Sequence, residues 1–210
     1  KQLPEFEFSV PGDISSAAFW LVAAAVTPQS RLKIRNVGLN PTRTGILDVM
    51  ASAGCSVVAE LLGDQLGEPV GHLEVTFKSN LRPFEISGSI VPRLIDEIPI
   101  LAVLASQCDG VSQFQDIGEL RVKESDRIET MANALRKMGV NVEAGVDWMT
   151  IAGPSKLSGI DFDAAGDHRI AMTLAIAGLV CEGQMNVSGA DSIQTSYPSF
   201  MSDLERVIVV

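Results

Sequence analysis

The sequence is poor in aromatic residues, in histidine and in paired cysteines, and each shortage excludes a kind of protein. Aromatic side chains make up only 5% of the 210 residues, so an apolar core has to be built mainly from Ala, Val, Ile and Leu. Two histidines and three cysteines without a C-x-x-C pair do not have the spacing of a zinc site. We therefore expect no bound metal, and we expect Cys55, Cys108 and Cys181 to be reduced thiols of a cytoplasmic protein.

Basic charge and long apolar runs are also scarce. Sixteen Lys and Arg residues against 26 Asp and Glu residues give a net charge of −10, which argues against a general binder of nucleic acid or of anionic membranes. The longest apolar runs, 17–26 and 170–181, are shorter than the stretch of about 20 residues that spans a bilayer. They instead predict helices buried in a globular core.

An internal repeat is the clearest feature that is present. The segments 15–38, 95–118 and 168–191 each contain an apolar stretch of about three turns, a polar or glycine break, a short strand and a turn. In the first two, a more amphipathic helix follows, over 42–54 and 123–139, and then a pair of strands. The repeated order is therefore β-α-β-α-β-β.

These units predict a single α/β domain over residues 1–210, with pseudo-repeats near 6–80, 84–153 and 156–210. Amphipathic helices and short sheets should surround the most apolar helices, which are expected near 15–27, 97–108 and 169–181. The third unit reaches Val210 without a closing strand pair. We therefore expect the third unit to be incomplete and to leave an open sheet edge.

The starts of the apolar helices are the first candidate site. Superposing the repeats places Ser16, Asp96 and Arg169 at equivalent positions, where free N–H groups and positive dipole ends suit an anion. The alternative is structural, because aspartate and serine commonly cap helices. The residues to which this alternative applies are Asp13, Ser15, Asp96 and Asp167.

A cationic segment, ELRVKESDR at 119–127, is the second candidate. If a helix begins near Lys123, then Lys123 and Arg127 lie one turn apart, with Glu124 beside them. Two cations at a helix N-terminus oppose the helix dipole, and a bound phosphate or carboxylate would explain them. The alternative is a solvated turn with a local Glu124–Arg127 ion pair. His168 and Arg169, which open the third apolar helix, would add donors for an anion, although a lone histidine is usually structural.

Motifs for other chemistries are missing. The sequence has no Walker loop, no G-x-G-x-x-G after a strand, no H-E-x-x-H and no G-x-S-x-G. We therefore expect no cofactor.

Several segments resemble, in the same order, the 5-enolpyruvylshikimate-3-phosphate synthase family. They are VPGDISSAAF (10–19), VGLNPTRTG (37–45), VPRLIDEIPILAVLA (91–105), ELRVKESDRI (119–128) and GDHRIAM (166–172). The resemblance covers nearly the whole chain, and RVKESDR and DHRIAM are its most specific parts. It implies the fold of the C-terminal lobe of a two-lobed enolpyruvyl transferase.

The resemblance implies transfer of the carboxyvinyl group of phosphoenolpyruvate to the 5-hydroxyl of shikimate-3-phosphate, by addition and elimination and without a metal or organic cofactor. Asp96 matches the acid that contacts the shikimate hydroxyls and can act as a base. Glu124 matches the glutamate proposed to exchange protons with the methylene group, and Lys123 matches an active-site lysine. Phosphate or the inhibitor glyphosate would occupy the phosphoenolpyruvate subsite, which matches Arg127, His168 and Arg169.

The sequence also departs from the family pattern. It lacks the family's opening segment and the ligands of the other lobe, and it has IQTSYP at 193–198, where some members place a lysine. We therefore expect half of an active site, inactive without a complementary lobe. The alternatives are a non-catalytic module that binds anions and a structural subunit that pairs its open sheet edge with another chain or with itself.

Overall fold

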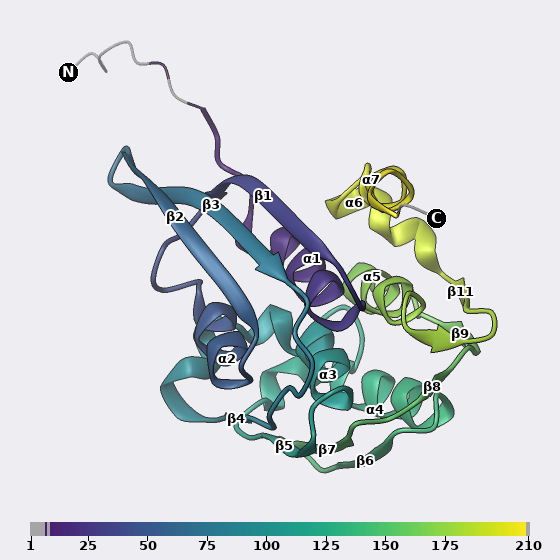
Figure 1. Ribbon diagram of the computed structural model, residues 1–210. Helices are drawn as coiled ribbons and strands as arrows, with labels where there is room; N and C mark the ends of the chain where they lie inside the picture. The colour runs from purple at the N-terminus through teal and green to yellow at the C-terminus, as the bar shows by residue number, and fades with distance from the viewer. Residues whose placement is uncertain (1–6, 8, 209–210) are drawn as a thin grey trace.

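The computed structural model describes residue 7 and residues 9–208. At its centre three apolar helices lie side by side, with sheets and further helices around them (Figure 1). These are α1 (Ile14–Val26), α3 (Ile98–Ser106) and α5 (His168–Ala177). The predicted start of the first repeat at residue 6 and the last two residues of the third lie outside the described part of the chain.

The central helices are buried because they are apolar on every side. Every residue of α3 is buried, and in α1 only Ser16 is not. Each buried Leu, Ile or Val side chain contributes roughly 1.5–3 kcal/mol to folding. The third helix is shorter than predicted, since the N–H groups of Leu179 and Val180 form tighter i to i−3 bonds that end it, and Cys181 lies in a strand.

The first unit has the predicted order. A parallel bridge connects Gly12, which lies before α1, to Val37, which lies after α1. An antiparallel sheet with the strand order β1-β3-β2 packs beside the helix. The remaining elements of this unit are β1 (Arg31–Gly38), α2 (Gly45–Ser52), β2 (Ser56–Gln65) and β3 (Glu68–Thr76).

The second unit repeats this plan and confirms the β-α-β-α-β-β reading. Its first strand pairs in parallel with the strand after the buried helix, and an antiparallel hairpin completes the order β4-β5-β7-β6. Its strands and second helix are β4 (Glu85–Ile86), β5 (Gly110–Phe114), α4 (Arg127–Lys137), β6 (Asn141–Ala144) and β7 (Met149–Gly153). Short 3-10 turns occupy Gly88–Arg93, Ile95–Glu97 and Gly118–Val122.

The third unit is the smallest, as expected. It forms two separate parallel strand pairs, β8 with β10 and β9 with β11, and in the described residues no strand follows α7. Its elements besides α5 are β8 (Leu157–Ser158), β9 (Asp161–Asp163), β10 (Cys181–Glu182), β11 (Asn186–Ser188), a 3-10 turn (Ala190–Ser192), α6 (Ile193–Ser196) and α7 (Phe200–Val207).

Aromatic side chains fix α7 against α1. Phe200 is fully buried and meets Phe19 edge to face, while the Trp20 indole N–H donates to the Tyr197 hydroxyl at 3.1 Å. Several of the few aromatic residues of the sequence therefore lie where α7 packs against α1. Among the described residues, no helix has the length and apolar character needed to cross a bilayer.

Candidate active site

Most of the candidate residues meet in one network of ion pairs at the starts of α3, α4 and α5. Asp96 lies in the 3-10 turn before α3, and Lys123 and Glu124 lie in the loop before α4. Arg127 is the first residue of α4, and Arg169 lies in the first turn of α5. Contacts of 2.5–3.7 Å connect these five side chains, so the second and third units together build the network.

Arg127 is the centre of the network and is only 1% exposed. Its Nε donates to Asp167 Oδ2 at 2.8 Å, its Nη1 to Asp96 Oδ1 at 3.1 Å and its Nη2 to Glu124 Oε2 at 2.5 Å. A buried guanidinium needs such partners, because an unpaired buried charge is strongly destabilising. The predicted Glu124–Arg127 pair is therefore present, as part of a larger network around a buried arginine.

Asp167 holds Arg127 from the protein interior. This fully buried carboxylate accepts from the Ser125 hydroxyl at 2.9 Å and, as the N-cap of α5, from the N–H groups of Arg169 and Ile170. Burial alone would raise the pKa of Asp167, but Arg127 and these hydrogen bonds outweigh burial and lower the pKa. Asp167 is therefore an ionised anchor as well as the predicted helix cap.

Two further cations lie beside Asp96. Lys123 Nζ contacts Glu119 Oε1 at 2.8 Å and Asp96 Oδ1 at 3.7 Å, and the hydrogen bond to Glu119 is the main cause of its raised pKa. Arg169 Nη2 lies 3.5 Å from Asp96 Oδ2. Lys123 therefore remains a cation at neutral pH, close to the same carboxylate that faces both arginines.

Glu97 is a neighbour of the network that the sequence did not single out. It is 3% exposed, and its Oε1 lacks a hydrogen-bond partner and lies 4.0 Å from Arg169 Nη1. Burial raises the pKa of Glu97, whereas Ser15 and Arg169 oppose that shift. Its position next to Asp96 in the sequence could have indicated a place near the site, but not its burial.

His168 opens α5 at the edge of the network and is partly buried. Burial lowers the pKa of His168, Arg169 lowers it further, and the carboxylates of Glu124 and Asp167 act in the opposite direction. The imidazole is therefore neutral at pH 7, and it can donate one hydrogen bond and accept one.

One prediction about local structure is wrong, and the alternative in which Asp96 is a helix cap does not hold either. The helix expected to begin near Lys123 begins at Arg127, because Asp126 caps it by accepting the Glu129 N–H. Asp96 does not cap α3, whose first turn follows a 3-10 turn that ends at Glu97. The Asp96 carboxylate is consequently directed to the cations of the network. At Ser16, the third expected helix start, the backbone N–H donates to the carboxylate of Asp13.

Arg121 fixes the loop that carries Lys123 and Glu124. Its guanidinium donates to Asp126 at 2.5 Å, to the Val146 carbonyl at 2.6 Å and to the Gly145 carbonyl. It thereby ties the cap of α4 to the β6–β7 turn. This connection (115–126) is longer than its equivalent in the first unit (39–44), which joins β1 to α2.

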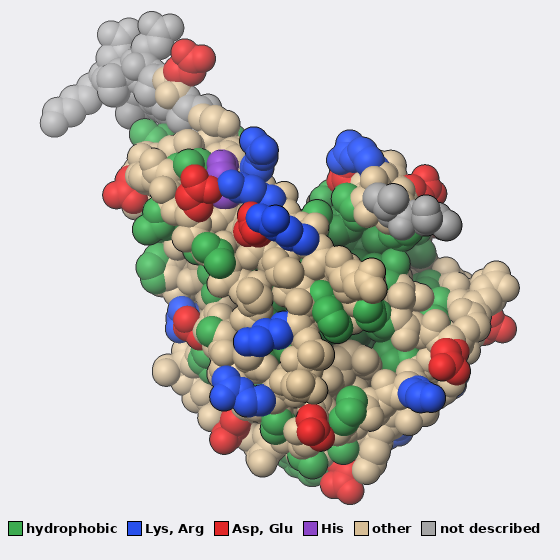
Figure 2. Space-filling model, in the orientation of Figure 1, with side chains coloured by type: hydrophobic (Ala, Val, Ile, Leu, Met, Phe, Trp, Pro, Cys, Tyr) green, Lys and Arg blue, Asp and Glu red, His purple; other side chains and the backbone are tan. Residues whose placement is uncertain are grey.

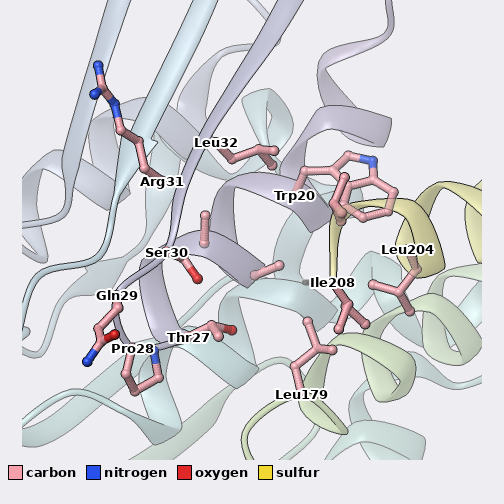
Figure 3. A pocket seen from close by; sticks show the side chains of 13 residues that line it. Trp20, Thr27, Pro28, Gln29, Ser30, Arg31, Leu32, Leu179, Leu204 and Ile208 are labelled. Carbon is pink, nitrogen blue, oxygen red and sulfur yellow. The ribbon is translucent and has the colours of Figure 1, made fainter. Parts of the chain in front are cut away.

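A separate cavity lies away from this network. It has a volume of about 520 Å³ and lies at the C-terminal end of α1, and its lining includes the apolar side chains of Trp20, Leu179 and Leu204 (Figure 3). Arg31, the charged residue of its lining, points away from the cavity and pairs with Glu74. Figure 2 shows the surface hollowed there, between the β1 sheet and α7. Among the described residues, the lining of this cavity contains no Asp, Glu, His, Cys, Lys or Tyr, so the lining offers no acid or base for catalysis at neutral pH.

A smaller cavity of about 320 Å³ lies by the N-terminus of α1. Its Arg43 pairs with Asp13 at 2.9 Å and donates to the Ser15 hydroxyl at 3.0 Å. Within residue 7 and residues 9–208, no group of at least three His, Cys, Asp or Glu side chains is arranged to hold a metal ion.

Known proteins are similar to this chain in sequence and in fold. A family model described as EPSP synthase (3-phosphoshikimate 1-carboxyvinyltransferase) matches residues 1–204. The chain belongs to the EPSP synthase family. It resembles the 3-phosphoshikimate 1-carboxyvinyltransferase of Prochlorococcus marinus (strain MIT 9303), at 49% identity over 94% of this chain and 45% of the relative. The protein of the same name from Streptococcus pyogenes serotype M1 is 49% identical over 99% of this chain and 48% of its own length.

The solved EPSP synthase from Acinetobacter baumannii superposes with a TM-score of 0.91 at 35% identity, covering 94% of this chain and 46% of that one. The predicted family and fold class are confirmed. The chain spans about half the length of the relatives that it matches. The network around Arg127 therefore lies within one lobe of the EPSP synthase fold.

Proposed function

We propose that this chain supplies one half of the active site of a 3-phosphoshikimate 1-carboxyvinyltransferase. The observation that supports it is the network in which Asp96, Glu124, Lys123 and Arg169 surround the buried Arg127. The reaction adds the 5-hydroxyl oxygen of shikimate-3-phosphate to C2 of phosphoenolpyruvate while the methylene carbon gains a proton. Loss of a methyl proton and of phosphate then gives the carboxyvinyl ether.

The acids of the network suit the two proton transfers. Asp96 is proposed as the base for the hydroxyl proton, since its carboxylate is about one-third exposed and lies beside three cations. Glu124, half exposed on its loop, is proposed to exchange the methylene proton together with Lys123. Both acids are held by Arg127, which fixes their positions relative to each other.

The cations and the imidazole suit the phosphoenolpyruvate anion. Arg127 and Arg169 present guanidinium groups at helix starts, where the helix dipole adds positive potential. His168, which is neutral at pH 7, can donate a hydrogen bond to phosphate or carboxylate. Glyphosate or free phosphate would compete for the same groups. The three unpaired cysteines support a reducing, cytoplasmic location for this chemistry.

The remaining ligands are proposed to come from a complementary lobe. To test this, the chain is combined with the N-terminal half of the Streptococcus pyogenes relative, and phosphate release from phosphoenolpyruvate is measured with and without shikimate-3-phosphate. We expect turnover only with both halves, reduced about 10²–10⁴-fold by Asp96→Asn. Asp109→Asn, on an exposed aspartate, is the matched control. Turnover by the chain alone would refute the dependence, and no turnover by the pair would refute the function.

A structural role is the second candidate, and the edge strand β2 favours it. Within the described residues β2 is paired along one side only, and Val58, Leu61 and Leu62 on it are 54–69% exposed. Such an edge can pair with another chain or with a second copy. Sedimentation that shows a strict monomer at high concentration would exclude self-association.

A further inference from the structure

The two edges of the Arg127 guanidinium have partners of different kinds. Towards the interior, Nε and Nη2 donate to the two oxygens of Asp167, at 2.8 and 3.3 Å. Towards the solvent, Nη1 and Nη2 donate to Asp96 and Glu124. Asp167 is fully buried, whereas the side chains of Asp96 and Glu124 are 35% and 48% exposed. One edge is therefore anchored, and the other is held by groups that water can reach.

The outer edge is the one that a ligand would use. A carboxylate or phosphate binds a guanidinium best through two parallel N–H groups. Asp167 occupies the inner pair of N–H groups, and its further bonds to Ser125, Arg169 and Ile170 make its displacement costly. The outer N–H groups are not vacant either, because Glu124 lies 2.5 Å from Nη2.

We propose that an incoming anion exchanges with Glu124 at the outer edge of Arg127, so that ligand binding itself releases this acid. The inference rests on the proposed function, in which Arg127 helps to bind the phosphoenolpyruvate anion. Glu124 is the group that leaves, since it is half exposed, lies on a loop and can be rehydrated at little cost. Asp96 keeps Lys123 and Arg169 as partners when its bond to Arg127 is lost.

The exchange gives Arg127 a second task besides holding the anion. Without ligand, the Glu124 carboxylate forms an ion pair with Arg127, and its Oε2 accepts a hydrogen bond from the guanidinium. With ligand, the same carboxyl group is freed next to the bound molecule, where proton transfer is needed. The acid therefore becomes available only when there is a substrate on which it can act.

The test is calorimetric titration of the 210-residue chain with phosphoenolpyruvate. Removing the internal competitor should tighten binding by about tenfold in Glu124→Gln, because one charge-assisted hydrogen bond no longer has to be broken. Glu124→Ala, which removes the acceptor altogether, should tighten binding at least as much. Glu129→Gln, the same change on an exposed residue in the first turn of α4, should leave the dissociation constant unchanged.

Salt separates direct competition from simple charge repulsion. Repulsion between exposed charges is screened at high ionic strength, whereas competition for the same N–H group persists. We expect the ratio of wild-type to Glu124→Gln dissociation constants to be the same in low and high salt. A ratio near one, or one that collapses in high salt, overturns the exchange while leaving anion binding intact. No binding by the wild type or by either Glu124 variant refutes anion binding at Arg127 by this chain and the exchange with it, whereas the proposed function is refuted separately by the absence of turnover with the complementary lobe.

Discussion

Arg127 and Asp167, forty positions apart in the sequence, form a buried ion pair with 2.8 Å between Nε and Oδ2. The pair connects the first turn of α4 to the cap of α5. Arg127 lies in the second unit and Asp167 in the third, so the pair joins these two units. Its strength can be measured directly.

Asp167→Asn should destabilise the chain by about 3 kcal/mol at pH 7, because it removes the buried counter-charge of Arg127. The wild-type pKa of Asp167 is lowered, so the stabilisation is complete above the ordinary value of 3.8 and disappears as the pH falls through the folded-state pKa. Urea unfolding at pH 7 and at acid pH measures both effects. Asp109→Asn is the control, and an equal loss of stability at both pH values would contradict the argument.

Glu97→Gln should stabilise the chain at pH 7 by about 1 kcal/mol, since it removes a buried charge whose Oε1 has no hydrogen-bond partner. The pKa of Glu97 is raised, so the ionised form opposes folding above the folded-state pKa. The difference between variant and wild type should therefore vanish below the unfolded-state pKa. Thermal melts across this pH range test it, and a destabilised variant at pH 7 would show that the carboxylate has a partner that compensates its burial.

Arg121→Lys should loosen the loop at 118–126 and cost about 1 kcal/mol of stability. Lysine keeps the charge but cannot donate at once to Asp126, Gly145 and Val146. Hydrogen exchange should become faster in this loop and stay unchanged in α3. Arg136→Lys is the matched control, because Arg136 also donates to a backbone carbonyl, at Val142, outside the loop. Unchanged exchange at 118–126 would mean that other contacts hold the loop.

His168 should titrate below its ordinary pKa of 6.5, mainly because it is partly buried and also because Arg169 is its neighbour. The folded state then disfavours the protonated ring, so stability should fall as the pH drops through 6.5 towards the folded-state pKa. NMR titration of the imidazole signals measures the value, and His168→Asn identifies which of the two histidines is observed. A value above 6.5 would show that Glu124 and Asp167 outweigh burial and Arg169.

The core was predictable because its signals are local. An uninterrupted apolar run such as 98–105 can only be a buried segment, and its recurrence along the chain revealed the repeated units. The glycine after α4 was predictable for the same reason, since Gly139 adopts a φ of +92°, which few other residues tolerate.

The burial of Arg127 was not predictable, because it depends on contacts between distant segments. A cationic segment with Glu124 three residues before Arg127 has the same appearance whether it is solvated or buried. The difference comes from Asp96 and Asp167, which the fold brings to the guanidinium from two other elements. The start of α4 is set by its cap Asp126, and a distant contact takes part there too, because Arg121 connects Asp126 to the β6–β7 turn.

The longer connection between β5 and α4 carries candidate site residues that are not part of the repeated scaffold. Each of the three units contains a buried apolar helix. Lys123 and Glu124, in contrast, lie on the connection 115–126. The equivalent connection in the first unit, 39–44, is shorter. A copied architecture can in this way acquire a single asymmetric site, and substitutions in that loop can alter specificity without disturbing the helices that the repeats have in common.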